Sequence, residues 1–476
     1  MTKLTMTQAA FLLLVLAILV AACAGPRVEI EERGVGSVAV SAAGVTPAAT
    51  PERTMPAITL VPPAATEAAT VLPTLTSPPL TPMPAPELPA NGCGVRLPLM
   101  APRAAPPVTA VTPIWPDHLT IPEEAQAALD YLLAHPGHVG LAAYRVGQEE
   151  QGVYLNADMP MPLASVVKLI HLVAYIEAVG DGRLDPTSWV PVTDLEQYFL
   201  PGSDLRAHPN ALDELTSRGL VGQNPPAVPL EELPGMMMRY SSNAATDYLH
   251  MRLGQDVIEE TAVRLGLTNQ TAPCPFLGQF LLISNHTRTM DNRSAIQSLI
   301  DNPALYGQAV MELTTAYSSS DQFRADEGRW YQRSRRPTWQ DQSLFSENLN
   351  AQGSAGDYAN LMATIAQEQL GDSYTSFLAR RYLEWPLAAY PVNQELFHMV
   401  GYKNGSLPGI LTTVYYASPQ GSGGLVVVAL FYRNLPEATY REWRRSLTHD
   451  DLARWLLTDP QAINGLRDVI NGGSGN

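Results

Sequence analysis

The chain contains 476 residues, and its 46 acidic side chains outnumber its 30 lysines and arginines, which gives a net charge of −16. Such an excess of negative charge disfavours nucleic acid and anionic membrane surfaces as partners. The three cysteines form no Cys-x-x-Cys pattern, and no His-Glu-x-x-His pattern is present, so the sequence offers no zinc site. We predict that the protein uses neither a metal nor an organic cofactor.

The N-terminus has the pattern of an export signal. Lys3 precedes the apolar run Ala9–Ala22, which at 14 residues is short for a membrane span. Cys23 follows directly, as in a bacterial lipoprotein signal, where residues 1–22 are removed and the cysteine is lipidated. The alternative is an ordinary signal peptide with a chance cysteine. Both interpretations predict an exported protein, and the first anchors it by a lipid to the outer face of the cell membrane.

Residues 23–116 are predicted to form a disordered, extended tether. Residues 47–116 contain 18 prolines mixed with alanine, threonine and valine, a composition that cannot build a core. In polyproline form at ~3.1 Å per residue, such a segment reaches roughly 200 Å, enough to hold a domain within a cell wall. Cys93, near the end of the tether, could pair with Cys274, but two free thiols are equally compatible with the sequence.

Residues 117–460 are predicted to form one folded α+β domain, followed by a flexible tail at 461–476, in a monomeric protein. Strand patterns lie at both ends of this region and helical patterns lie between them. This order predicts a five-stranded antiparallel sheet flanked by helices, with a helical subdomain in the middle. The predicted elements are a helix at Pro122–Ala134, strands at Val139–Val146, Gly152–Asn156, Phe397–Lys403, Ile410–Ala417 and Leu425–Tyr432, and a terminal helix at Arg441–Leu457.

The stretch Leu163–Ile176 predicts a helix that is apolar nearly all the way round and therefore buried. Its polar residues Ser165, Lys168 and His171 recur at steps of three, so they share one face. Since a buried ammonium without partners costs several kcal/mol, that face should line a polar cleft. A hydroxyl one turn before such a lysine is the layout of an activated nucleophile. The alternative is an N-cap serine followed by a lysine that reaches solvent.

Lysine usage favours the functional interpretation. The sequence contains only three lysines, Lys3, Lys168 and Lys403, and its other 27 basic residues (30 − 3) are arginines. A buried lysine can lose its proton and act as a base, whereas arginine stays protonated in proteins. The two lysines outside the signal are therefore the first candidates for chemistry.

Two further stretches carry polar groups that could face the same cleft. Ser241 and Asn243 precede a predicted helix that starts near Ala244, so they could relay a proton and hold a substrate carbonyl, or simply cap the helix. Lys403 ends a predicted strand and is followed by Asn404 and Gly405. Asn-Gly is a strong hairpin signal, but here the lysine could instead place positive charge over the cleft.

In this order, the three stretches resemble the signature of the penicillin-recognising serine hydrolases, specifically the class A β-lactamase-like branch. The signature consists of Ser-x-x-Lys, Ser-x-Asn and Lys-Thr/Ser-Gly. The resemblance covers roughly residues 125–457 and implies a β-lactamase/transpeptidase-like fold. The motifs stand here as Ser165-Val-Val-Lys168, Ser241-Ser242-Asn243 and Lys403-Asn404-Gly405.

The resemblance also implies roles for individual residues. Ser165 would be the nucleophile of an acyl-enzyme mechanism and Lys168 its base, while Ser241 would shuttle a proton and Lys403 would steady a substrate carboxylate. The backbone N–H groups of Ser165 and Ser406 would form the oxyanion hole. The implied substrate-binding residues are Asn243, Asn404, Gly405 and Ser406.

Three departures from this family matter for turnover. Class A enzymes activate the deacylating water with a glutamate, but no acidic residue occurs between Gly266 and Met290, where it is expected. The segment Glu347–Asn350 looks faintly similar, yet Glu347 lies 106 residues beyond Ser241 (347 − 241). Asn404 replaces a hydroxyl, and the strand Ile410–Ala417 carries no arginine. We therefore expect acylation to survive and deacylation to slow greatly.

An apparent insertion at residues 285–352 separates the second motif from the third. Arginine together with aromatic residues suits an anionic polymer or a peptide carboxylate, and the insertion could roof the cleft. The alternative is a solvated surface lobe. The residues concerned are Arg324, Arg329, Arg333, Arg335 and Arg336, with Trp330, Tyr331 and Trp339.

We conclude from the sequence that the protein is a serine hydrolase that acts through an acyl-enzyme. Its expected partner is a β-lactam or the D-alanyl-D-alanine stem peptide of peptidoglycan. One alternative is a D,D-peptidase or penicillin-binding protein with slow deacylation. Another is a catalytically weakened domain that only binds the cell wall.

Overall fold

The computed structural model describes residues 93, 94, 97, 115, 119–285, 290–333, 337–421 and 424–472, of which 331–333 are described by their backbone alone. The predicted signal, Cys23, nearly all of the predicted tether, and Arg335 and Arg336 lie outside these residues. Within the described ranges, no helix is both long enough and apolar enough to cross a membrane.

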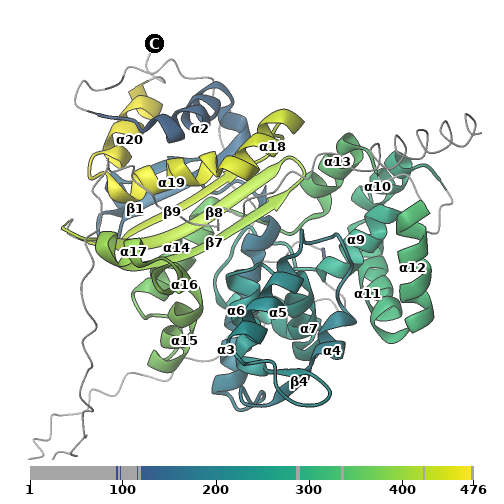
Figure 1. Ribbon diagram of the computed structural model, residues 1–476. Helices are drawn as coiled ribbons and strands as arrows, with labels where there is room; N and C mark the ends of the chain where they lie inside the picture. The colour runs from purple at the N-terminus through teal and green to yellow at the C-terminus, as the bar shows by residue number, and fades with distance from the viewer. Residues whose placement is uncertain are drawn as a thin grey trace, which may run out of the picture. The chain divides into compact units, whose positions relative to one another are not determined.

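The centre of the fold is a five-stranded antiparallel sheet with the strand order β2-β1-β9-β8-β7 (Figure 1). The first two strands of the chain and the last three build this sheet, so the prediction of a sheet assembled from both ends is confirmed. The strands are β1 (Val139–Arg145), β2 (Val153–Leu155), β7 (Phe397–Leu407), β8 (Ile410–Pro419) and β9 (Val426–Tyr432).

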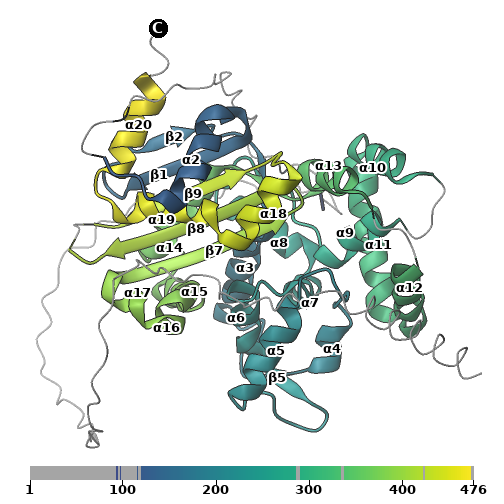
Figure 2. The same ribbon diagram turned by 45° about the horizontal axis from the view of Figure 1, so that its top comes forward.

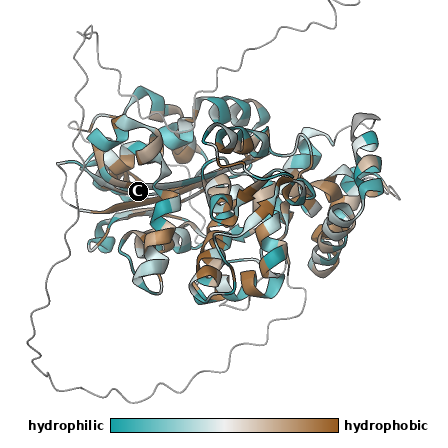
Figure 3. Ribbon diagram, turned by 60° about the horizontal axis from the view of Figure 1, so that its bottom comes forward, coloured by the Kyte–Doolittle hydropathy of each residue, from teal (hydrophilic) through white to brown (hydrophobic). Residues whose placement is uncertain are grey.

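Both faces of the sheet are buried at its central strand β9, and every residue of this strand is apolar. Val427, Ala429 and Phe431 point into the core on one face, and the residues between them point into the core on the other. Figure 3 shows hydrophobic residues concentrated along the sheet. Burial on both faces is what allows such continuous apolar runs in a strand.

Helices from both ends of the chain cover one face of the sheet, as the turned view in Figure 2 shows. The opposite face packs on α14, and two short helices lie along the edge strand β7. The first set is α2 (Glu123–Ala134), α18 (Glu437–Ser446), α19 (Thr448–Thr458) and α20 (Ala462–Gly472). The second is α14 (Ala355–Ala366), α15 (Ser373–Leu383), α16 (Trp385–Ala389) and α17 (Pro391–Leu396).

The middle of the chain forms the predicted helical subdomain. A 3₁₀ turn at Ala164–Val167 leads into α3 (Lys168–Gly180), which is buried among its neighbours. The other helices are α4 (Val192–Glu196), α5 (Ala207–Ser217), α6 (Leu233–Met238), α7 (Asn243–Leu253), α8 (Gln255–Arg264) and α9 (Phe276–Ser284). Two small ladders complete this region, β3 (Met161–Pro162) with β6 (Gln352–Gly353) and β4 (Trp189–Pro191) with β5 (Ala227–Pro229).

The described part of the insertion contains the helices α10 (Asn292–Ile300), α11 (Pro303–Ser319), α12 (Asp321–Arg333) and α13 (Trp339–Leu349). Helix α11 packs closely on α9 at Gly278. A Cβ built on this glycine would lie only 2.2 Å from the Val310 carbonyl oxygen, so no larger residue fits there. Two of the predicted anion-binding arginines have partners nearby. Arg324 pairs with Asp321, and Arg329 pairs with Asp326. These contacts favour a surface lobe over an anion-binding roof.

Three boundaries differ from the prediction. Residues 461–476 are not a flexible tail throughout, since α20 buries Ile463 and Leu466, whose spacing matches one helix face. The terminal helix is broken into α18 and α19 at Leu447, which takes a left-handed conformation with φ of 63°. Cys93 and Leu97, which were expected in the tether, are buried against the domain.

Candidate active site

The 3₁₀ turn before α3 places Ser165 beside the sheet. Ser165 is half-buried in this turn. The preceding residue, Ala164, has a positive φ of 47°, a conformation that is uncommon for a residue with a side chain. Strained backbone of this kind persists only where the surroundings hold it, and it gathers at functional sites.

Lys168, one turn after Ser165, is fully buried and hydrogen-bonded to the start of α7. Its Nζ donates to the Ser241 carbonyl oxygen at 2.6 Å, to Ser241 Oγ at 3.2 Å and to Asn243 Oδ1 at 2.7 Å. Burial lowers the pKa of Lys168 to about 7, although the charges of Asp247 and Asp204 oppose this shift. An amine with such a pKa can serve as a base near neutral pH.

At the start of α7, one residue caps the helix and its two neighbours are left to bind Lys168. Ser242 is the N-cap, since its hydroxyl accepts from the Ala245 N–H at 3.1 Å. Ser241 and Asn243 are therefore free to turn towards Lys168. Ser241 also has a positive φ of 65°, so this second hydroxyl sits on strained backbone as well.

Lys403 brings a second buried amine to the same hydroxyl. Its Nζ donates to Ser241 Oγ at 3.1 Å and to the Asn404 carbonyl oxygen at 2.6 Å. Burial, and then the charge of Lys168, hold the pKa of Lys403 well below its ordinary value, against the opposing charge of Asp450. Two buried amines thus converge on the Ser241 hydroxyl.

Strand β7 continues past Lys403 to Leu407, so Asn404-Gly405 is not a hairpin turn. Gly405 lies directly against the turn that holds the reactive serine. A Cβ built on Gly405 would be 2.5 Å from the Ser165 amide nitrogen and 2.8 Å from the Leu163 carbonyl oxygen. The Thr412 hydroxyl donates to that same carbonyl at 2.8 Å and ties β8 to the turn. Only glycine lets the strand come this close.

Ser406, the next residue on β7, contacts an arginine that sequence reasoning missed. Arg444 on α18 donates through Nε to Ser406 Oγ at 3.3 Å. The sequence offered little signal for this contact, because α18 follows the third motif by more than 30 residues and belongs to the other face of the sheet.

Asp247 is a second missed residue, a buried carboxylate next to the site. It accepts from the Phe276 and Leu277 N–H groups at 2.8 and 2.7 Å, and so caps the start of α9. Burial raises the pKa of Asp247 to about 7, and these two backbone N–H groups and the charge of Lys168 oppose the rise. This capping brings the Phe276 ring over Lys168, with the Nζ 4.6 Å from the ring centre.

Asn350 is the third missed residue, and it corrects the view that Glu347–Asn350 is too far along the chain. Asn350 Oδ1 accepts from the Ala164 N–H at 2.8 Å, directly before Ser165. The long insertion hides this proximity in the sequence, because it loops out and returns the chain to the site. Glu347 instead faces Arg433 at 3.4 Å.

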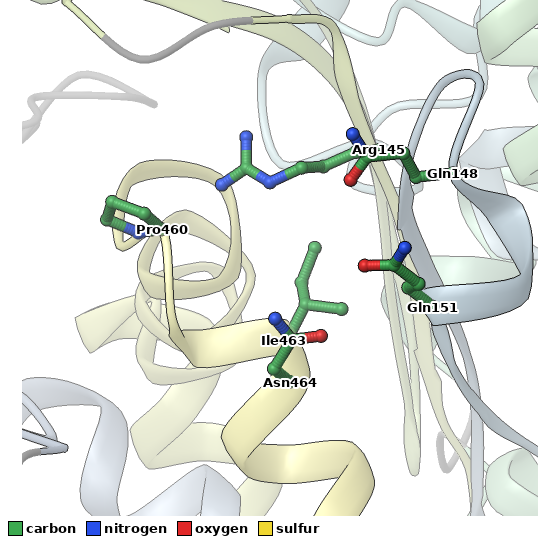
Figure 4. Close-up of a pocket in the computed structure, with 6 residues that line it drawn as sticks. All are labelled: Arg145, Gln148, Gln151, Pro460, Ile463 and Asn464. Carbon is green, nitrogen blue, oxygen red and sulfur yellow. The ribbon is translucent and has the colours of Figure 1, made fainter.

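In the described ranges, no group of histidines, cysteines and acidic residues is arranged to hold a metal ion. A small cavity lies elsewhere, where the chain after β1 meets α20 (Figure 4). It is lined by Arg145, Gln148, Gln151, Pro460, Ile463 and Asn464, none of which belongs to the three motifs.

The sheet, the helical subdomain and the serine turn between them define the β-lactamase/transpeptidase class of fold. The family model described as "Beta-lactamase enzyme family" matches residues 123–450, which is more than half of the chain. The protein therefore belongs to the β-lactamase enzyme family.

Solved structures with similarity to this chain include β-lactamases and PBP-A. A β-lactamase from Sphaerobacter thermophilus is 19% identical, with 73% of this chain and 99% of that chain covered and a TM-score of 0.43. A β-lactamase from Chitinophaga pinensis is 15% identical, with 70% and 100% covered and a TM-score of 0.40. A variant of PBP-A, an acyl-enzyme complex with penicillin G, is also 15% identical, with 66% and 89% covered and a TM-score of 0.38. No curated protein gives a significant match.

Proposed function

We propose that this protein is an exported serine hydrolase whose Ser165 is acylated by β-lactams or by the D-alanyl-D-alanine peptides that they mimic. The observation that carries the proposal is the convergence of two buried amines on one hydroxyl. Lys168 and Lys403 both donate to Ser241 Oγ, and Lys168 follows Ser165 by one helical turn.

The proposed first step is attack by Ser165 Oγ on the substrate carbonyl carbon, with its proton passing to a neutral Lys168 Nζ. A protonated Lys168 spends its three N–H groups on Ser241 and Asn243. Of those partners, only the Ser241 hydroxyl can donate, so Ser241 is the group able to carry the proton on to the leaving nitrogen. The backbone N–H groups of Ser165 and Ser406 would stabilise the oxyanion.

The substrate carboxylate would lie by Lys403 and Ser406. Asn404 lacks the hydroxyl that the family motif places there, and Arg444 supplies positive charge at Ser406 instead. Guanidinium suits a carboxylate because its N–H groups form a planar fork.

We further propose that the acyl-enzyme is long-lived, as in a penicillin-binding protein. The two carboxylates whose charges act on Lys168, Asp247 and Asp204, both accept hydrogen bonds from backbone N–H groups, and Asp204 Oδ2 accepts that of His208 at 3.0 Å. Asp247 caps α9, and Glu347 faces Arg433. The Phe276 ring covers Lys168 on the α9 side, so an apolar surface lies next to the proposed base and disfavours a bound water there.

Labelling with fluorescent penicillin tests both parts of the proposal. We expect covalent labelling of the full chain that is lost in Ser165→Ala and persists for many minutes in the unmodified protein. No labelling of a folded protein would contradict the acylation step and favour a domain that only binds the cell wall. Label that is released within seconds would instead favour a β-lactamase.

A further inference from the structure

The segment that leads into α9 is joined to the N-terminal part of the chain by a disulfide. Cys93 and Cys274, which are 181 residues apart in the sequence, are bonded to each other. Beside this bond, the Gly94 N–H donates to the Ala272 carbonyl oxygen at 2.9 Å, and the Leu97 N–H donates to that of Gln270 at 3.0 Å. The end of the predicted tether is therefore fixed along residues 270–274.

A continuous chain of hydrogen bonds runs from this disulfide to the serine turn. Gln279 Nε2 donates to the Cys274 carbonyl oxygen at 2.9 Å, and Gln279 Oε1 accepts from Asn350 Nδ2 at 3.3 Å. Asn350 Oδ1 then accepts from the Ala164 N–H at 2.8 Å. Each of the two amides uses its donor on one side and its acceptor on the other, so the orientation of one fixes that of the next.

The disulfide is buried, so it is a permanent connection rather than a switch. Cys93 is 0% exposed and Cys274 is 5% exposed, and Tyr306 and Ile296 pack against them. A Cβ on Gly307 of α11 would lie 2.0 Å from the Cys93 carbonyl oxygen, which shows how closely the insertion covers the bond.

We propose that the Cys93–Cys274 disulfide and Gln279 are positioning elements for Ser165. Asn350 holds the Ala164 N–H while Ala164 keeps its positive φ, and Gln279 in turn holds Asn350. Without the covalent tie, the Cys274 carbonyl is no longer fixed and the chain of amides loses its anchor. The serine turn then relaxes, and the hydroxyl of Ser165 leaves the position from which it attacks.

The experiment measures the rate of penicillin labelling, so it rests on the proposed function, and it uses full-length variants. The variants are Cys93→Ala/Cys274→Ala, Gln279→Ala and the combination of all three. The matched control is Gln308→Ala, which removes an exposed glutamine whose side chain donates to Glu312 of its own helix. All rates are measured at a temperature at which thermal melting shows each variant to be folded.

We expect the disulfide variant and Gln279→Ala each to be labelled about tenfold more slowly, because small misplacements of a reacting group have large effects on rate. The combined variant should also be about tenfold slower, since changes within one connected network are not additive. Gln308→Ala should keep the normal rate. A purely structural disulfide would lower the melting temperature and leave the rate unchanged, which would overturn the proposal. A combined loss of about a hundredfold would show independent effects and would also overturn it.

Hydrogen exchange in a peptide spanning residues 163–167 gives a second measurement that needs no activity. Exchange should be faster in the disulfide variant and in Gln279→Ala than in the control. If the unmodified protein is not labelled at all, the proposed function fails. Unchanged exchange in both variants would then overturn the positioning role separately.

Discussion

Replacing Gly405 by alanine should disable the site without unfolding the protein. The added Cβ would lie 2.5 Å from the Ser165 amide nitrogen, 2.6 Å from Thr412 Oγ1 and 2.8 Å from the Leu163 carbonyl oxygen. Ordinary contacts of a Cβ begin near 3.4 Å, so the serine turn and β7 must separate by 0.9 Å (3.4 − 2.5). Two of the three neighbours are backbone atoms and cannot rotate away.

The consequence should be larger for reactivity than for stability. Overpacking a tight site costs about 1–3 kcal/mol of folding free energy. A displacement of about 1 Å at a reacting group can slow the reaction by about 10²-fold. We therefore expect Gly405→Ala to melt a few degrees lower and to be labelled by fluorescent penicillin about a hundredfold more slowly.

Stopped-time labelling followed by gel fluorescence measures this rate, with thermal melting recorded on the same samples. Gly137→Ala is the matched control, because a Cβ there meets nothing within 4 Å. A normal labelling rate in a folded Gly405→Ala protein would refute the claim that β7 fixes the reactive serine.

Further predictions concern proton transfer, the aromatic cover and acid stability. Lys168→Arg should lose labelling by at least about 10²-fold because guanidinium does not give up its proton, and unchanged labelling would exclude Lys168 as the base. Since burial lowers the pKa of Lys168 to about 7, the labelling rate should rise with pH up to about that value and then level off; a flat profile from pH 5 to 9 would contradict it. Phe276→Ala should shorten the life of the acyl-enzyme by admitting water beside Lys168, and a pulse-chase with unlabelled penicillin would detect no change if the ring has no such role. Burial lowers the pKa of His208 to about 4, so the native state resists its protonation, and the contribution of His208 to stability should be full above pH 6.5 and fall by up to about 1.4 kcal/mol per pH unit below it. Urea unfolding between pH 4.5 and 6.5 should therefore show a smaller loss of stability with falling pH in His208→Gln than in the unmodified protein, and equal losses would contradict this.

The sheet could be predicted from the sequence because its strands have short, clear patterns. The strand predicted at Leu425–Tyr432 is confirmed at Val426–Tyr432, where the continuous apolar run is buried on both faces of the sheet. The tail was predicted wrongly for the opposite reason. Ala462–Gly472 has glycine and asparagine among its apolar residues, and only packing on the sheet makes this amphipathic segment a stable helix.

The residues of the site also fall into a group that the sequence predicted and a group that it did not. Lys168, Ser241, Asn243 and Lys403 belong to compact motifs, and hydrogen bonds join them in the structure. Ser165 lies in the 3₁₀ turn directly before Lys168 and α3. The residues that support them could not be found in this way, because each is reached through an element distant in the chain. Phe276 lies in a segment that looks merely apolar, and its position depends on a capping bond from another helix.

The contacts at the start of α9 also explain how the fold tolerates a long insertion near the proposed reactive serine. The chain leaves the site after α9 and returns at Asn350, and in between it builds a lobe that packs on α9 through Gly278. An insertion at this point would loosen α9 and with it the Phe276 ring, unless other contacts fixed the start of this helix. Asp247 fixes the start of α9 from α7, and the Cys93–Cys274 bond fixes the segment just before it. The same bond ties the N-terminal segment to the catalytic domain, so in the exported protein we propose, the tether would meet the domain at the element that covers the catalytic lysine.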